Sequence, residues 1–243
     1  MKKILLSLLF AMPFVSLQAQ DMGFGVELEG SYKITKQVEA SFDAEIRSQE
    51  GMSEMERISF GASVDYKIGH GSKFEAGYVL MAKQDLAHDS KKYHYVDDWG
   101  TRQRAFVGYT FSVMWGKHVK ASIRERYQYT YTAPANLERY YLSDLEHRAS
   151  DKVEEAGHEH LLRSRVQLEF IIRKKCPWTP YLSLENLNDL SHHLRNDQTR
   201  YTLGTDYKLD KHNKLSLAYR FKDKSNKDEA KGHLITISYS HAF

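Results

Sequence analysis

The sequence has a single cysteine, no long apolar run after its first fifteen residues, and little net charge. Cys176 is the only cysteine among 243 residues, which excludes a disulfide within the chain. No apolar stretch of about 20 residues follows Val15, which excludes a membrane-spanning helix. The 35 Lys and Arg residues nearly balance the 32 Asp and Glu residues, so the charge argues against a nucleic-acid partner. The fold must be stabilised in another way, and closed strand pairing is one.

The first nineteen residues have the pattern of a secretory signal peptide. Met1, Lys2 and Lys3 form a basic start, residues 4–15 are apolar, and Ala19 is a small residue suited to cleavage before the next position. We therefore predict a signal peptide over 1–19 and a β-barrel domain over 20–243. Loss of the two lysines would lower the formal charge from +3 to +1.

From about Gly23 onward, apolar and polar residues alternate in segment after segment. In residues 38–47, every even position is apolar and every odd position is polar or charged. A period of two places one strand face in lipid and the other in a polar interior, which is typical of a transmembrane β-barrel. Strands are expected at 23–33, 38–47, 56–68, 73–83, 99–113, 118–131, 161–172, 178–187, 198–209, 214–222 and 232–243.

Short and long connections alternate between these eleven segments. Short turns face the periplasm and long loops face outward in outer-membrane barrels, and bacterial single-chain barrels use even strand numbers. We therefore predict an all-β protein, a single antiparallel transmembrane β-barrel of ten to twelve strands, with a preference for twelve. The longest loop, 132–160, is expected to cover the barrel mouth or present a binding surface, with disorder after Ser150.

Charged residues at inward positions divide the predicted lumen into two walls. If the acidic wall reaches across to the basic stripe, the lumen is bridged and conductance is low; otherwise the stripe is a binding surface for carboxylates or phosphates. Bridging is favoured because six unpaired arginines are costly in a narrow space. The acidic wall is formed by inward acidic residues of the first four predicted strands, Glu39, Asp43, Glu45 and Glu75 among them, and the basic stripe comprises Arg102, Arg104, Arg124, Arg126, Arg163 and Arg165.

Glu125 falls on the lipid-facing parity between Ile123 and Tyr127. Three interpretations remain open: a β-bulge that turns it inward, a position near the membrane surface, or a lipid-facing catalytic acid. Loop histidines such as His158 and His160 leave a hydrolase at the outer rim open, but no serine stands in a recognisable nucleophile setting and no known metal-ligand spacing is present. We therefore assign no catalytic residue, no cofactor and no metal, and we favour a role other than catalysis.

Several stretches along the chain resemble one known family. They are RQR at 102–104, RERYQYT at 124–130, LRSR at 162–165, KKCPWTPY at 174–181, RY at 200–201 and YSHAF at 239–243. They are similar to the uncharacterised outer-membrane barrels grouped as domain of unknown function 2490. The resemblance implies a barrel of unassigned activity, and no catalytic residue follows from it.

The sequence leaves three functions open for a protein expected in the cell outer membrane. The first is a narrow or plugged pore or binding protein for small polar or charged solutes. The alternatives are a rim hydrolase acting on lipid or surface peptide, and a closed structural barrel that presents its loops to a partner. Expected partners are outer-membrane lipid, a small solute and the outer-membrane insertion machinery, for which the final strand and Phe243 resemble the assembly signal; no nucleic acid is expected.

Overall fold

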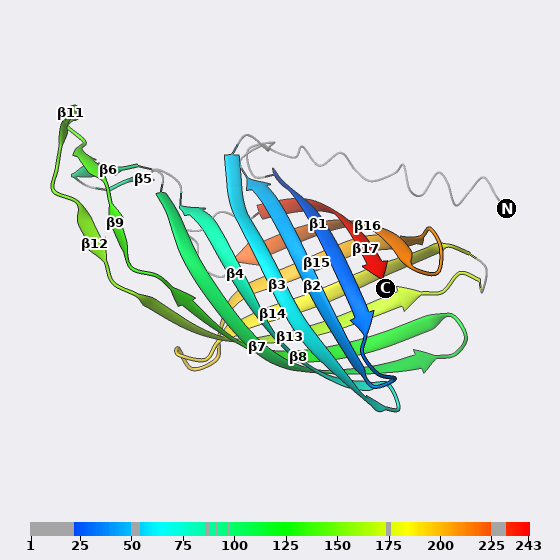
Figure 1. The fold of residues 1–243 in the computed structure, drawn as a ribbon. Coiled ribbons are helices and arrows are strands. Elements are labelled where there is room, and N and C mark those ends of the chain that lie inside the picture. Colours follow the sequence, from blue (N-terminus) through cyan, green and yellow to red (C-terminus); the bar gives the residue numbers. More distant parts are fainter. Residues whose placement is uncertain are drawn as a thin grey trace, which may run out of the picture.

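Eleven of the described strands close into a barrel in which every neighbouring pair is antiparallel except one (Figure 1). The computed structural model describes residues 22–49, 54–85, 88–90, 92–96, 98–173, 176–224 and 232–243. The predicted signal peptide and its cleavage site lie outside these residues. Among them, no helix has the length and apolar character needed to cross a bilayer.

The barrel strands follow each other around the wall almost in chain order. Starting at β1, the order is β1, β17, β16, β15, β14, β13, β8, β7, β4, β3 and β2. Their bounds are β1 (Met22–Lys33), β2 (Val38–Gln49), β3 (Glu54–Gly69), β4 (Ser72–Asp85), β7 (Asp98–Trp115), β8 (Val119–Thr132), β13 (Gly157–Phe170), β14 (Trp178–Asp189), β15 (Arg195–Lys208), β16 (Asn213–Lys224) and β17 (Gly232–Ala242).

The closed barrel confirms the predicted fold class and the range of ten to twelve strands. The preference for twelve is wrong for the described residues, because β1 pairs with β17 in parallel and an odd number of strands closes in this way. Leu28 pairs with Tyr239 across this seam. Ser31 also accepts a hydrogen bond at 2.8 Å from the backbone N–H of Phe243, so the last residue of the chain is held at the seam.

The outward face carries the apolar half of each alternating strand. Phe60 is 61 % exposed and Val107 is 55 % exposed, and Leu28, Ile123 and many other large apolar side chains are similarly open. Side chains of this kind are buried in a soluble protein, and a continuous apolar belt around a closed barrel is the face that meets lipid.

The two ends of the barrel differ. The connections 34–37, 70–71, 116–118, 171–177 and 209–212 leave one end, which we call the turn end. The two longest connections, 86–97 and 133–156, leave the other, which we call the loop end. Several strands run further toward the loop end than the sequence predicts; β14, for example, continues to Asp189.

The long loops fold into a β-arm that projects from the loop end (Figure 1). Its four-stranded sheet contains β5 (His88–Asp89), β6 (Tyr93–Tyr95), β10 (Arg139–Tyr141) and β11 (Asp144–Arg148), while β9 (Ala135–Leu137) pairs with β12 (Lys152–Glu154). The guanidinium of Arg139 lies 4.1 Å from the ring centroid of Tyr93 and donates to the carbonyl of Ser150 at 2.7 Å. The expected disorder after Ser150 is wrong, because β12 and β13 follow it.

Side chains fill the loop-end half of the lumen. The inward side chains near this end are almost completely buried; for example, Leu234 is 1 % exposed and Gln128 is 2 % exposed. Gln128 also accepts a hydrogen bond from Arg163 Nη1 at 3.1 Å, which joins this layer to the charged residues below it. We call the layer the plug, and its members are Met81, Gln128, Leu161, Leu187, Gln198 and Leu234.

Candidate functional site in the barrel lumen

Four arginines form a two-by-two array on the inward face of β8 and β13. Arg124 stands directly across from Arg165, and Arg126 stands directly across from Arg163. The alternation of each strand, with Ile123 on the outward face, turns all four guanidinium groups into the lumen. Like charges directly opposite each other are destabilising, so the array needs negative groups close by.

Glu185 on β14 is the main partner of this array. Its carboxylate accepts hydrogen bonds from Arg124 at 2.9 Å, from Arg163 at 2.8 Å and from Arg200 on β15 at 3.4 Å. The Glu185 side chain is only 9 % exposed. One carboxylate therefore connects four strands of the wall. Sequence analysis did not single out Glu185. The neighbouring Leu184 faces outward, so the alternation of β14 places Glu185 in the lumen.

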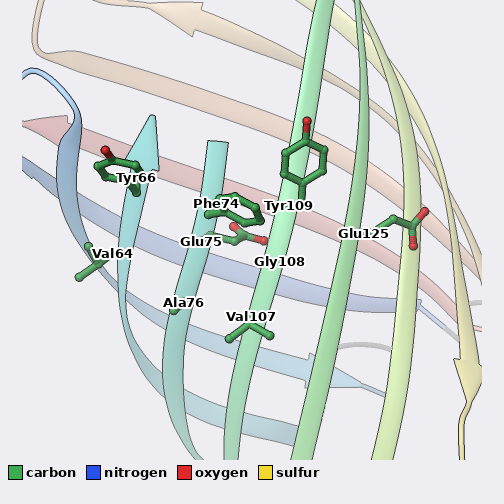
Figure 2. A pocket seen from close by; sticks show the side chains of 9 residues that line it. All are labelled: Val64, Tyr66, Phe74, Glu75, Ala76, Val107, Gly108, Tyr109 and Glu125. Carbon is green, nitrogen blue, oxygen red and sulfur yellow. The ribbon is translucent and has the colours of Figure 1, made fainter. Parts of the chain in front are cut away.

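Glu75 provides the second partner from the other side of the array. Its carboxylate accepts a hydrogen bond at 2.9 Å from Arg126, although β7 lies between the two strands. Gly108 on β7 makes this possible, because a Cβ atom there would overlap the Glu75 carboxylate. Figure 2 shows Glu75 beside Gly108. The guanidinium of Arg126 also lies 4.1 Å from the ring centroid of Phe106.

Carboxylates form a matching array on the opposite wall. Glu27 stands across from Glu45, and Glu29 stands across from Asp43, on the inward face of β1 and β2. Four strands separate β1 from β13, and three separate β2 from β8. The acidic and basic arrays therefore face each other across the barrel, as the sequence predicts for Asp43 and Glu45.

The predicted acidic wall does not itself bridge to the arginines. Glu45 pairs with Arg47 and Arg57 at 2.5 Å each, and Glu39 pairs with Lys67 at 2.5 Å near the turn end. The predicted pairing with the six arginines is therefore wrong for Glu39, Asp43 and Glu45, whereas Glu75, another inward acid of the first four predicted strands, does pair with Arg126. The charges are bridged, but through Glu75 and Glu185, because those residues lie two strands or fewer from the arginines along the wall.

Arg102 and Arg104 lie closer to the loop end than the array does. Arg102 stands across from Thr132 at the end of β8, and the Nε–H of Arg104 donates to Thr130 at 3.3 Å. The predicted six-residue stripe therefore divides into an array of four and a pair nearer the loops.

Positive charge exceeds negative charge around the array. Five arginines, at 124, 126, 163, 165 and 200, surround two carboxylates, Glu75 and Glu185, which leaves a formal charge of +3. In the described part of the chain, the Nε–H groups of Arg124 and Arg163 are also buried without a hydrogen-bond acceptor. Buried donors of this kind are uncommon, and one explanation is an anion or water that completes the site.

The lumen becomes more open toward the turn end. Lys120 and Glu169 form an ion pair of 3.2 Å with side chains 39 % and 25 % exposed, and Asp206 and Lys214 are 31 % and 42 % exposed. The plug lies on the other side of the arrays. Lumen side chains are thus more exposed near the turn end and almost completely buried near the loop end.

Glu125 lies on the outer surface, at the middle of the fourteen residues of β8. The pairing of β8 with both neighbours shows no register shift, so the β-bulge interpretation is wrong. Its carboxylate accepts a hydrogen bond from Ser164 at 2.6 Å and borders an outward pocket of about 570 Å³ (Figure 2). His160 lies four residues from Ser164 on the same strand, about 13 Å away, too far to activate that hydroxyl.

The loop histidines His158 and His160 are hydrogen-bonded to tyrosines of β8. Tyr129 hydrogen-bonds His158 Nδ1 at 2.7 Å, and Tyr127 hydrogen-bonds His160 Nδ1 at 2.8 Å. Glu159 lies between them on the opposite strand face, so the three side chains do not converge. Within the described ranges, no group of three or more His, Cys, Asp or Glu side chains is arranged to hold a metal ion.

Comparison with known proteins supports the barrel and leaves its activity open. A family model described as "Protein of unknown function (DUF2490)" matches residues 26–231. The solved translocator domain of autotransporter NalP from Neisseria meningitidis is similar with a TM-score of 0.50 and 12 % identity, over 80 % of this chain and 71 % of that chain. At this identity the likeness shows the fold alone. No curated protein matches.

Proposed function

We propose that this chain, which belongs to the DUF2490 family of proteins of unknown function, is an outer-membrane barrel that binds a small charged solute from the periplasm and does not conduct ions freely. We infer this function from the lumen of the barrel. The likeness to an outer-membrane translocator barrel and the outward apolar belt support the location. Short turns face the periplasm in such barrels, so the turn end is placed on that side. The accessible half of the lumen then opens to the periplasm.

The Glu185 network is the observation that carries this proposal. Arginines from three strands meet one carboxylate on the lumen face of the wall, and the plug covers them on the loop side. We expect these packed and hydrogen-bonded side chains to leave ions no continuous water path, whereas an open porin keeps its lumen filled with water. Charged groups that remain accessible below the plug suit binding better than conduction.

Planar-bilayer recording on refolded protein tests the proposal. We expect the wild type to show no steady unit conductance. The plug variant L161A/L187A/L234A should conduct, because three buried side chains of the seal are shortened. The matched control shortens outward residues of the same strands, L162A/L184A/I235A, and should stay silent. A stable, ion-selective current through the wild type would refute the proposal.

A further inference from the structure

The two charged arrays lie at similar depths in the barrel. Counted from the turn end, Arg124 and Arg126 are the sixth and eighth of the fourteen residues of β8, and Glu29 and Glu27 are the fifth and seventh of the twelve residues of β1. The arrays also occupy opposite walls. A solute between the arrays therefore meets positive charge on one side and negative charge on the other.

Each array has capacity for a further partner. On the basic wall, the charge of +3 and the unpaired Nε–H groups of Arg124 and Arg163 favour an anionic group. On the acidic wall, only Glu45 of the four carboxylates takes part in an ion pair among the described residues. Glu27 and Glu29 accept hydrogen bonds from Ser238 at 3.0 Å and Ser240 at 2.6 Å, and neither forms an ion pair with a described residue. These carboxylates favour a cationic group.

The width of the lumen limits the solute. Eleven strands spaced about 4.8 Å apart and tilted about 40° give a backbone diameter of roughly 22 Å. Arginine side chains reach about 6 Å and carboxylates about 4 Å into this space, which leaves about 12 Å between opposing charges. After about 3 Å for a charge-assisted hydrogen bond at each side, about 6 Å remains for the solute. A dipeptide spans about 7 Å when extended, so its two termini match this gap.

We infer that the lumen binds a small zwitterion of about dipeptide length, with its carboxylate on the arginine array and its ammonium group on the carboxylate array. This inference rests on the proposed function, because it needs a sealed lumen that opens on one side. A zwitterion neutralises both walls at once. A solute with one charge pairs with one array and leaves the charge of the opposite array unneutralised.

Titration calorimetry on the refolded full chain in detergent tests the inference with three probes. Glycylglycine carries both charges, N-acetylglycylglycine carries only the carboxylate, and glycylglycine amide carries only the ammonium group. We expect glycylglycine to bind at least tenfold more tightly than either derivative. Equal binding of glycylglycine and the acetylated probe would overturn the zwitterion and leave a simple anion site. Absence of glycylglycine binding would also overturn the inference.

Two variants assign the ends of the solute. Arg165→Gln removes one charge from the arginine array without breaking an ion pair to Glu185, so it should weaken the carboxylate-bearing probes at least tenfold and leave the amide unchanged. Glu29→Gln should weaken the ammonium-bearing probes and leave the acetylated probe unchanged. Lys120→Gln, which changes a lumen charge near the turn end, is the control and should alter none of the three. If both array variants bind glycylglycine like the wild type, the inference fails.

The bilayer recording separates this failure from that of the proposed function. If the wild type does not conduct and binds none of the three probes, the proposal of a sealed lumen holds and only the zwitterion inference fails. If the wild type conducts ions, the proposal of a sealed lumen is refuted, whatever the titrations show.

Discussion

Replacing Glu185 with glutamine is the sharpest perturbation of this barrel. The substitution keeps the shape of the side chain but removes the charge shared by Arg124, Arg163 and Arg200. Removing one partner from a buried ion pair typically costs about 3–5 kcal/mol, because the remaining charge stays buried. Glu185 is 9 % exposed and contacts three arginines, so we expect E185Q to lower the free energy of unfolding by at least about 3 kcal/mol.

The assay is urea unfolding of refolded protein in detergent, followed by tryptophan fluorescence. Glu169→Gln is the matched control, because Glu169 is also a lumen carboxylate with a cationic partner, Lys120 at 3.2 Å. Both side chains of that pair are partly exposed, so its loss should cost no more than about 1 kcal/mol. If E185Q costs no more than E169Q, the Glu185 network does not stabilise the barrel and the argument for a sealed lumen loses its main support.

Three further predictions concern the turn end. Deleting Phe243, which is hydrogen-bonded to β1, should lower the amount of inserted barrel, measured as the heat-modifiable band on a gel; equal insertion would refute this. Gly71→Ala should cost more stability than Gly116→Ala, because both glycines have positive φ but only a Cβ at 71 meets a backbone carbonyl; equal urea midpoints would contradict this. Hydrogen bonds from the Asn213 side chain and from backbone N–H groups hold the pKa of Asp210 below its usual value, so the stability advantage of the wild type over D210N, present at neutral pH, should disappear as pH falls through the folded-state pKa. An advantage that does not change with pH would refute the assignment.

The period-two pattern predicted most of the fold, because each strand alternates between lipid and lumen. It placed Arg124 and Arg126 on the inward face correctly. It did not identify Glu185 as their partner, since parity tells which face a residue occupies but not which inward residues meet across intervening strands. That depends on the strand order and on residues such as Gly108, which lets Glu75 reach past β7.

The plug escaped sequence analysis for a different reason. Counting by two from Arg163 places Leu161 on the inward face, but alternation does not tell that this side chain packs into a buried layer and is only 4 % exposed. The parallel closure was missed for yet another reason. The eleven segments predicted from the sequence match the eleven barrel strands, but the rule that bacterial barrels have an even number of strands led to the preference for twelve.

The parallel seam also fixes the sidedness of the polypeptide. Since β1 and β17 run in the same direction, Met22 lies at the loop end and Phe243 at the turn end. With the turn end in the periplasm, the first barrel residue is at the cell surface and the last is inside the envelope. An antibody added to intact cells should therefore reach an epitope placed next to Met22 but not one placed after Phe243, whereas a barrel with an even number of strands would have both epitopes on the same side.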